Sequence, residues 1–234
     1  MLVGIHQPHY LPWLRYLEKI ARSDVFIVLD DVQYEKNGFQ NRNKIKTAQG
    51  WSYLTVPVLR PTQRPIREIE IDNRTNWREK HARAIELSYR KAPYFDRYWP
   101  ELSEVYNREW THLAELNRAM LEIYLRQLGI DTRLLYSSDL PTQGEATVRI
   151  AELCRLAGGD TYLSGAYAVH AYLDPEVLRA AGIRLAFQEW KAPVYSQLYP
   201  KAGFVPDLAI IDLLFNEGPR AKELLLESGG VTYP

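Results

Sequence analysis

Near its N-terminus the chain reads Ile5-His6-Gln7-Pro8-His9-Tyr10-Leu11-Pro12-Trp13, a turn bracketed by prolines. The turn joins a short apolar run, residues 2–5, to an amphipathic run, residues 14–22. A turn that only reverses the chain uses Gly, Asn, Asp or Ser. Because this turn carries two imidazoles, an amide and two large aromatic rings, it predicts a surface that holds a ligand.

The segments around this turn predict a strand–helix–strand unit. Residues 2–5 form the first strand, and the β-branched and aromatic run 25–29 is typical of a strand covered on both faces. A helix between them is indicated by apolar residues at helical spacing, Trp13, Leu14, Leu17, Ile20 and Ala21. The charged residues that fall between these positions are Arg15, Glu18, Lys19 and Arg22. Since such crossovers are right-handed, the strands are parallel and the turn lies at their carboxyl ends, where open α/β sheets bind ligands.

The rest of the chain continues the alternation of strands and helices. Further strands are predicted at 51–59, 64–71, 133–136, 161–163 and 183–187, the first two as a hairpin. Further helices are predicted at 77–90, 100–107, 111–128, 146–157 and 175–182, and a last one opens at Gly218-Pro219. Residues 32–46 have little apolar periodicity and are predicted to form a loop. The expected fold is a single α/β domain, residues 1–234, with a mainly parallel sheet flanked by helices and a helical insertion or lid at 77–128.

The composition is balanced and gives no global electrostatic signal. Lys and Arg number 29, as do Asp and Glu, so the net charge is zero, which weighs against a dedicated nucleic-acid-binding protein. Aromatic residues make up 12% of the chain, and they line sugar and nucleotide sites as well as cores. The single cysteine, Cys154, excludes an internal disulfide and is predicted to be a buried helical thiol. With no signal sequence and no apolar run near the roughly 20 residues of a membrane span, a soluble cytoplasmic protein is expected.

His6 and His9 are the first candidates for chemistry. On a strand-to-helix turn such a pair suits a metal ion, a phosphate group or acid–base catalysis. No Cys, His or acid at matched spacing accompanies them, so no metal centre is predicted. The alternative to a ligand contact is one ring bonded to backbone and one ring in solvent. His6 is the stronger candidate for a ligand contact.

Two acidic residues, Asp30 and Asp31, follow the second strand and point to the same edge of the sheet. A carboxylate there suits a magnesium ion or a substrate amine, and the alternative is an exposed strand end with Asp31 capping the next turn. Because adjacent residues in an extended segment face opposite ways, one ligand is expected to meet only one of them.

Cationic and amide side chains gather in the segment that follows, at Asn41, Arg42, Asn43, Lys44 and Lys46. They suit phosphate oxygens or a carboxylate, and the alternative is a solvated surface loop. Ser164-Gly165, after another predicted strand, marks a second ligand edge or a simple turn. The sequence contains no glycine-rich phosphate loop and no nucleophile elbow.

Several motifs together resemble the WbqC-like protein family. They include His6-Gln7-Pro8, Tyr10-Leu11-Pro12-Trp13, Tyr16, Lys19-Ile20, Leu29-Asp30-Asp31-Val32-Gln33-Tyr34, Asn41-Arg42-Asn43-Lys44-Ile45-Lys46, Tyr162-Leu163-Ser164-Gly165 and Ile211-Asp212-Leu213-Leu214-Phe215-Asn216-Glu217-Gly218. The resemblance spans nearly the whole chain. It departs from the family at His9, where an asparagine is expected in many members, and this departure favours His6 as the functional residue.

The resemblance implies a place in bacterial surface-polysaccharide pathways, such as O-antigen biosynthesis, and in amino-sugar pathways. The order of strand, histidine-containing turn, helix, strand and cationic segment is also similar to the HUP-type architecture of pantothenate synthetases and nucleotidylyltransferases. Those enzymes use first-turn histidines on nucleotide phosphates, so the similarity adds ATP as a candidate cosubstrate. This chain lacks the glycine that their motif carries between two histidines.

The leading hypothesis is a transferase or ligase that joins an acyl or aminoacyl group to an amino group on a nucleotide-linked amino sugar. Its expected catalytic residues are His6, Asp30 and Asp31. The residues expected to contact the substrate are Gln7, Tyr10, Trp13, Tyr16, Gln33, Tyr34, Asn41, Arg42, Lys44, Lys46 and Ser164. The alternative is a non-catalytic module that binds a nucleotide sugar or glycan in an aromatic cleft. Nucleic-acid binding is not expected of a chain with no net charge.

Overall fold

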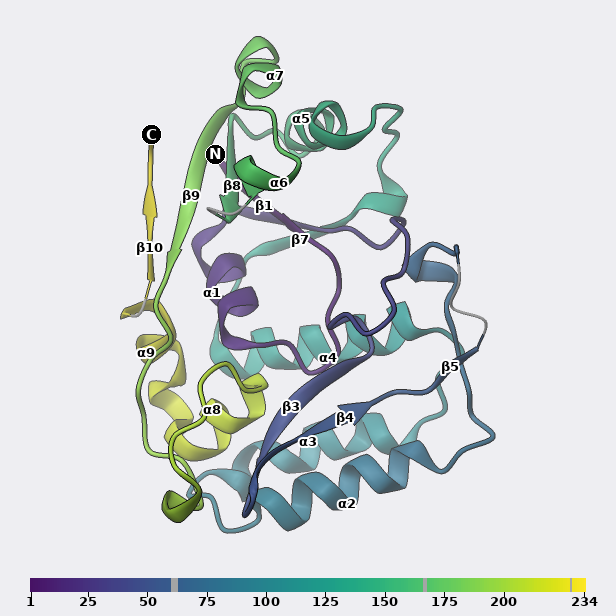
Figure 1. Cartoon of the computed structure of the whole chain (residues 1–234), viewed down its shortest axis with the longest axis vertical. Coiled ribbons are helices and arrows are strands. Elements are labelled where there is room, and N and C mark those ends of the chain that lie inside the picture. The colour runs from purple at the N-terminus through teal and green to yellow at the C-terminus, as the bar shows by residue number, and fades with distance from the viewer. Residues whose placement is uncertain (60–62, 166–167, 228) are drawn as a thin grey trace.

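The computed structural model describes residues 1–59, 63–165, 168–227 and 229–234, and its centre is a six-stranded sheet (Figure 1). The strand order is β10-β9-β8-β1-β2-β7, and neighbours are parallel except for β10, which is antiparallel to β9. The strands are β1 (Leu2–His6), β2 (Val25–Val28), β7 (Arg133–Tyr136), β8 (Thr161–Gly165), β9 (Arg184–Trp190) and β10 (Gly229–Thr232). All but β10 fall where strands are predicted, which confirms the mainly parallel α/β sheet.

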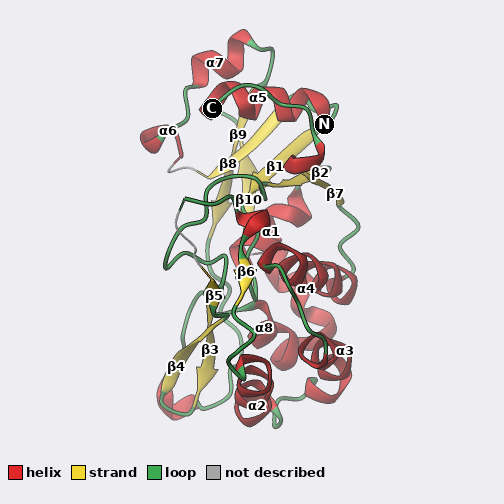
Figure 2. Ribbon diagram, turned by 90° about the vertical axis from the view of Figure 1, so that its right-hand side faces the viewer, coloured by secondary structure: helices red, strands yellow, loops and turns green. Residues whose placement is uncertain are grey.

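Helices cover both faces of this sheet (Figure 2). On one face, α5 (Ala146–Leu156) and α7 (Pro175–Ala180) bury a core that includes Val3, Ile5 and Ile27 of the strands. On the other face, apolar side chains such as Phe26 and Val28 belong to a larger core with α1 (Leu14–Arg22), α4 (Leu113–Leu128) and α9 (Ala221–Glu227). The alternating inward and outward residues of parallel strands therefore serve two separate cores.

The predicted helical insertion consists of α2 (Trp77–Tyr89), α3 (Phe95–Asn107) and α4, which pack with α8 (Ile210–Glu217) in the larger core. The predicted helix at 100–107 in fact starts at Phe95 and continues through Pro100. Burial of the large side chains Phe95, Tyr98 and Trp99 explains this, since each contributes roughly 1.5–3 kcal/mol. Together they outweigh the about 3 kcal/mol that a proline costs inside a helix.

The prediction of a loop for the whole of 32–46 was wrong at its C-terminal end. Residues Arg42–Thr47 form β3, which pairs in antiparallel fashion with β4 (Gly50–Thr55). Asn43 and Ile45 are buried, whereas Arg42 and Lys44 on the alternate positions are partly exposed. The strand escaped prediction because one of its inward positions is a polar asparagine. The predicted strand 51–59 divides into β4 and β5 (Val58–Leu59). The predicted hairpin with 64–71 is present only in shorter form, as β5 paired with β6 (Glu70–Ile71).

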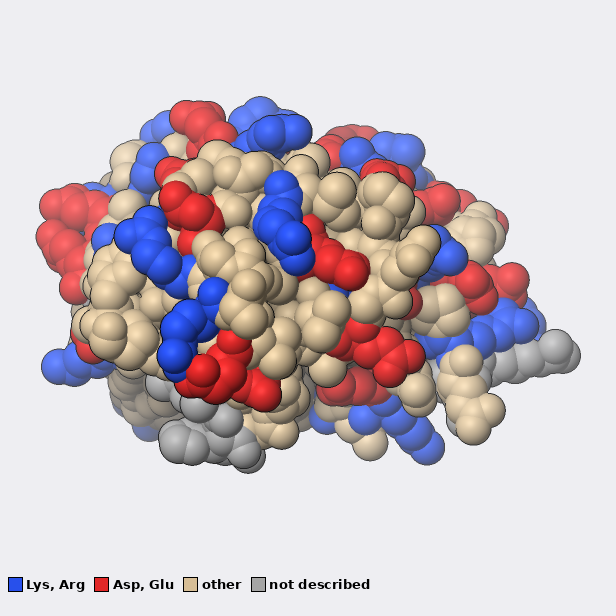
Figure 3. All heavy atoms as spheres, turned by 90° about the horizontal axis from the view of Figure 1, so that it is seen from above, with Lys and Arg blue, Asp and Glu red and all other residues tan. Residues whose placement is uncertain are grey.

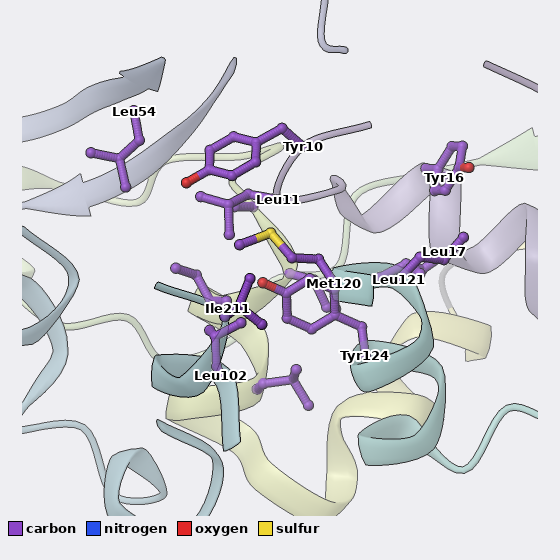
Figure 4. Close-up of a cluster of buried hydrophobic side chains, with 14 of the residues drawn as sticks. Tyr10, Leu11, Tyr16, Leu17, Leu54, Leu102, Met120, Leu121, Tyr124 and Ile211 are labelled. Atoms are coloured by element: carbon purple, nitrogen blue, oxygen red, sulfur yellow. The ribbon is translucent and has the colours of Figure 1, made fainter. Parts of the chain in front are cut away.

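The proline-bracketed turn sends its middle residues into the larger core. Figure 4 shows Leu11 pointing toward Met120 of α4, with Tyr10 lying beside Leu11. The Tyr10 hydroxyl lies 2.7 Å from His81 Nδ1 and 2.9 Å from the Tyr106 hydroxyl. Tyr10 therefore anchors the turn to the helical region and is fully buried, with no exposed surface for a substrate.

Several local predictions at helix ends are confirmed. Gly129, with a left-handed φ of 63°, ends α4, and the Asp174 side chain accepts a hydrogen bond from the Glu176 backbone at the start of α7. Cys154 is buried in α5. Among the described residues, none of the helices has the length and apolar character needed to cross a membrane.

Candidate functional site

The sheet opens at its centre, between β1 and β8. These strands pair only as far as Gly4 opposite Leu163. Beyond that point β1 continues with β2, to His6 opposite Val28, and β8 continues with β9 to Gly165. The chain builds the sheet outward from β1 in one direction and then from β8 in the other, so the strand order reverses here. Ligands of open α/β sheets bind in the crevice at such a point.

A cavity of about 680 Å³ lies at this opening. Its walls come from the carboxyl ends of β1 and β8, from α1, from the start of α5 with the loop before it, and from α6 (Ala168–Ala171). The volume lies within the roughly 300–1,000 Å³ of sites that hold small molecules and cofactors. No described residue of the helical region 77–128 lines the cavity. These helices lie in the lower part of Figure 1, away from the cavity.

His6 lines the cavity at the end of β1. Its Nδ1 lies 3.2 Å from the carbonyl oxygen of Gln7. Because a carbonyl only accepts hydrogen bonds, Nδ1 carries the proton and Nε2 keeps a free lone pair. Burial, and then the nearby Lys19 cation, lower the pKa of His6 to about 4. The ring is therefore neutral at pH 7 and offers a hydrogen-bond acceptor instead of a positive charge.

His9 is buried behind His6 and does not line the cavity. Its ring centre is 4.9 Å from that of His6 and stacks at 4.6 Å on Tyr16. Burial, with His6 as a second cause, holds the pKa of His9 well below its usual value. The arrangement makes His9 a packing partner of the two cavity residues His6 and Tyr16.

Three predicted substrate contacts, Gln7, Trp13 and Tyr16, also line the cavity. Gln7 is held by a 2.6 Å hydrogen bond that its side-chain oxygen accepts from Gln40. Trp13 stacks on Phe39 with ring centres 4.6 Å apart. Tyr16 is buried, and its hydroxyl has no hydrogen-bond partner among the described residues. These side chains give the cavity one apolar, aromatic wall.

Asp30 and Asp31, the predicted catalytic acids, are engaged with a neighbouring turn, η2 (Ser137–Asp139), and neither lines the cavity. Asp30 accepts hydrogen bonds from the Ser138 backbone at 3.0 Å and from the hydroxyls of Ser137 and Ser138. Asp31 also contacts the Ser137 hydroxyl and forms a 2.5 Å ion pair with Arg149. Both carboxylates therefore tie the end of β2 to the segment after β7.

The predicted cations Arg42, Lys44 and Lys46 lie on the β3–β4 hairpin, away from the cavity (Figure 1). Arg42 stacks over Tyr53 at 4.6 Å, and Lys44 lies 5.4 Å from the Trp51 ring centre. Lys46 is buried and donates to the Gln197 side chain and the Gly203 carbonyl. The structure thus does not bring these cations together with His6.

The remaining predicted contacts also lie outside the cavity. Asn41 donates to the Val56 carbonyl at 2.8 Å, and Tyr34 is buried in the larger core. Gln33 is exposed and forms an isolated bridge with Pro65. Ser164 is fully buried in β8, whereas Tyr162 and Gly165 of the same strand line the cavity. These four residues therefore contact other parts of the protein and do not line the cavity.

The cavity has cations that the sequence argument did not select. Arg15 and Lys19 of α1 line it, four residues apart and so on the same face of the helix. The Arg15 guanidinium has no hydrogen bond or ion pair with any described residue. Both residues fall on the polar face of the amphipathic helix predicted from the sequence, where charged side chains normally meet solvent. Their position over the crevice follows from the packing of α1 on the sheet.

The α5 side of the cavity adds a third cation, Arg149, whose charge is shared with Asp31. The first residues of α5 and the loop before it, from Gly144 to Ala146, complete this wall, and a helix start favours anions. The acids that line the cavity, Glu35 and Glu145, are exposed at its rim. On the face seen in Figure 3, cations and anions intermingle. Inside the cavity, Arg15 has no ion pair with a described acid, so its charge is available to an anionic ligand.

Comparisons with known proteins place the chain in a family. The sequence model of the WbqC-like protein family matches residues 7–224. The uncharacterized protein Rv1507c of Mycobacterium tuberculosis is 40% identical over 227 residues, which cover 95% of this chain and 96% of that protein. No solved structure is significantly similar to the chain. The matched region begins directly after β1 and His6, and it covers α1, α5, α6 and β8 around the cavity. Because it takes in most of the chain, the chain belongs to the WbqC-like protein family.

Proposed function

We propose that this protein is an amide-forming enzyme, a transferase or ligase that joins an acyl or aminoacyl group to an amino group. Its acceptor is a nucleotide-linked amino sugar, used in the cytoplasm for bacterial surface-polysaccharide biosynthesis such as that of O-antigen. The observation that carries this proposal is the cavity at the sheet opening, where a cationic interior meets a neutral imidazole. The first suits phosphates, and the second suits a substrate N–H group.

The strand order supports an ancestry among nucleotide-binding enzymes. Counting only the sheet strands in chain order, the arrangement from β7 to β10 is 3-2-1-4-5-6, the order of doubly wound dinucleotide-binding folds. The first five strands of this order are parallel and the sixth, β10, is antiparallel. The order is compatible with a HUP-type architecture, in which His6 stands at the first turn beside the crevice. ATP is therefore kept in the proposal as the reagent that activates a carboxylate when the donor is not already activated.

The proposed roles follow the positions of the side chains. Arg15, free of protein partners within the described residues, holds the phosphates together with Arg149 and the start of α5. Nε2 of His6 accepts a hydrogen bond from the substrate's amino group and orients it. Trp13 and Tyr16 form the apolar wall against which a base or sugar ring packs. Asp30 and Asp31 support this site through Arg149 and η2.

A non-catalytic binding module is the second candidate, and one surface favours it. Trp51 and Tyr53 of β4 are 49% and 38% exposed, and they carry Lys44 and Arg42 stacked against them. An exposed row of aromatic and cationic side chains suits glycans or sugar nucleotides. In this function the ligand sits on the β3–β4 hairpin, outside the cavity.

The test combines ligand binding with product formation, using UDP-glucosamine as the probe because its amino group is free. A ligand at 100 times its dissociation constant stabilises the fold by about 2.7 kcal/mol, which a thermal-shift assay detects. Mass spectrometry then follows amide formation with acetyl-coenzyme A, and separately with an amino acid plus ATP.

Matched arginine variants separate the two candidates. Arg15→Ala is expected to weaken binding by about 10- to 100-fold, since a hydrogen bond to a charged group contributes about 1.5–3 kcal/mol. Arg42→Ala, on the hairpin, is expected to leave binding unchanged. The reverse result, with Arg42→Ala harmful and Arg15→Ala silent, places the ligand on the hairpin. Tight binding with no product from either donor supports the binding module.

A further inference from the structure

Lys19 is a buried amine at the point where the sheet opens. Its side chain comes from α1, and the residue is only 5% exposed. Its Nζ donates a 3.1 Å hydrogen bond to the carbonyl oxygen of Ile5, the first residue of β1 beyond the pairing with β8. The amine also lies 5.7 Å from the ring centre of Tyr162 in β8. Lys19 therefore fills the gap between the two strands and faces the cavity.

The amine has no counter-ion within the described part of the chain. The neighbouring acid, Glu18, is bound instead by Arg22 at 2.8 Å and by the Gln188 side chain. Arg15 adds a second positive charge from the same helix. The other ionisable groups that face Lys19 are Cys154 from α5, Tyr162 from β8 and His6 from β1. A charged ammonium group in this position is poorly compensated.

Burial, and then the charge of Arg15, lower the pKa of Lys19 to about 7, although Cys154 and Glu18 act in the opposite direction. A substantial fraction of this side chain is therefore uncharged at neutral pH. A proton-transfer group works best when its pKa is close to the operating pH.

We propose that Lys19 is the proton acceptor of the cavity, the residue that takes the proton lost by the substrate's amino group as the amide forms. The inference rests on the proposed function. The amine nitrogen bonds to the acyl carbon, the bond from that carbon to its leaving group breaks, and the leaving group departs with the electron pair. The proton moves from the amine nitrogen to Nζ. The acyl donor belongs to the thioester or acyl-phosphate class.

The other basic groups near the cavity are poorer acceptors. His6, with a pKa of about 4, binds a proton roughly 1,000-fold less tightly than a group with a pKa of about 7. Asp30 and Asp31 are committed to η2 and Arg149. The two roles therefore divide, with His6 orienting the amine and Lys19 taking its proton.

The first arm of the test needs no substrate. Competitive labelling of the intact protein with acetic anhydride at a series of pH values, read by peptide mass spectrometry, gives the pH at which each lysine becomes reactive. Lys19 is expected to react with a midpoint near pH 7, and exposed Lys80 on α2 serves as the internal reference. A Lys19 that reacts in step with Lys80, or that never reacts, overturns the proposal.

The second arm uses variants in the amide-forming assay described above. Lys19→Met keeps the length and removes the base, and Lys19→Arg keeps a charge that cannot be lost at these pH values. In the wild type, kcat/KM is expected to rise with pH through pH 7 as Lys19 loses its proton. Both variants are expected to lower kcat/KM at pH 7 on the order of 100-fold or more and to lack this rise. Lys80→Met is the matched control, and thermal melting confirms that each variant folds.

The outcomes separate this inference from the proposed function. If amide forms and Lys19→Met keeps the wild-type rate and pH profile, the inference fails and the function stands. If no donor gives an amide, the proposed function fails together with the assignment of Lys19 as its base, even when the labelling midpoint lies near pH 7.

Discussion

At the scale of single residues, Asp30 and Asp31 show how a correct local rule misleads. Adjacent residues of a strand do face opposite ways, but β2 ends at Val28 and both acids lie beyond it. The chain bends there, so both carboxylates reach the Ser137 hydroxyl. The acidic pair therefore serves as a clamp between β2 and the segment after β7.

This clamp predicts a loss of stability when Asp30 is replaced. Asp30→Ala leaves the Ser138 backbone N–H and the Ser138 hydroxyl without their acceptor, whereas the Ser137 hydroxyl keeps Asp31 as its acceptor. Since each buried unsatisfied group costs about 1–3 kcal/mol, a total loss of about 3 kcal/mol is expected. Urea unfolding followed by tryptophan fluorescence measures it. Asp131→Ala, at an exposed position, is the control and should change the unfolding free energy by less than about 0.5 kcal/mol.

Lys19 and Glu18 are the residues that sequence reasoning could not place. Charged residues on an amphipathic helix are normally assigned to solvent, yet both are buried, with exposed fractions of 5% and 0%. Glu18 is satisfied by Arg22 and Gln188, and Gln188 lies 170 positions further along the chain. Only the tertiary fold brings β9 against α1, so no local pattern reports this burial.

At the scale of elements, the predictions succeeded where apolar patterning is strong. The strands β1, β2, β7, β8 and β9 are apolar runs buried by helices, and they were found from the sequence. β10 was missed because Gly229 and Gly230 have low strand propensity. The strand forms through its antiparallel pairing with β9, which no local pattern reports. In the cationic hairpin, β4 falls within the predicted strand 51–59, but β3 was missed because Asn43 occupies one of its inward positions.

The contact between β1 and the end of α1 predicts a severe effect of a single methyl group. A Cβ added at Gly4 would lie 2.3 Å from the Ser23 hydroxyl and 2.7 Å from the Phe26 ring. Gly4→Ala is therefore expected to cost about 1–3 kcal/mol through overpacking. Gly230→Ala is the matched strand control, because among the described residues the nearest atom to its Cβ, outside the adjacent residues, would be 3.8 Å away, on the Glu189 side chain.

The measurement for this pair is the urea midpoint at constant m-value. Gly230→Ala should be neutral or slightly stabilising, since alanine restricts the unfolded chain more than glycine does. Equal midpoints for the two variants would falsify the view that β1 and α1 meet through a glycine-sized gap.

At the scale of the whole molecule, the site depends on two cores that meet only through the sheet. One core carries α5 and the other carries α1, and the cavity lies where the sheet between them opens. Ionisable groups are buried in each core or beside it. The free energy of unfolding therefore depends on pH. His6, His9 and His81 have pKa values below their usual range, and the carboxyls Glu18 and Asp212 have pKa values above it.

These shifts act in opposite directions on stability. The histidines bind protons more tightly in the unfolded chain, so their contribution is complete above pH 6.5 and is lost as the pH falls toward about 4. Asp212, whose pKa is raised to about 6 mainly by burial, contributes most below pH 3.8 and loses that contribution as the pH rises through about 6. Glu18 acts in the same direction as Asp212.

Between about pH 4.5 and 6, the three histidines favour the unfolded state and the two acids oppose them, so the unfolding free energy is expected to fall on acidification. Asp212→Asn removes one opposing acid, so its slope should be steeper than that of the wild type by up to about 1.4 kcal/mol per pH unit. Urea titrations at several pH values measure both slopes. A slope that is flat in the wild type, or unchanged in Asp212→Asn, contradicts the assignment of these buried groups.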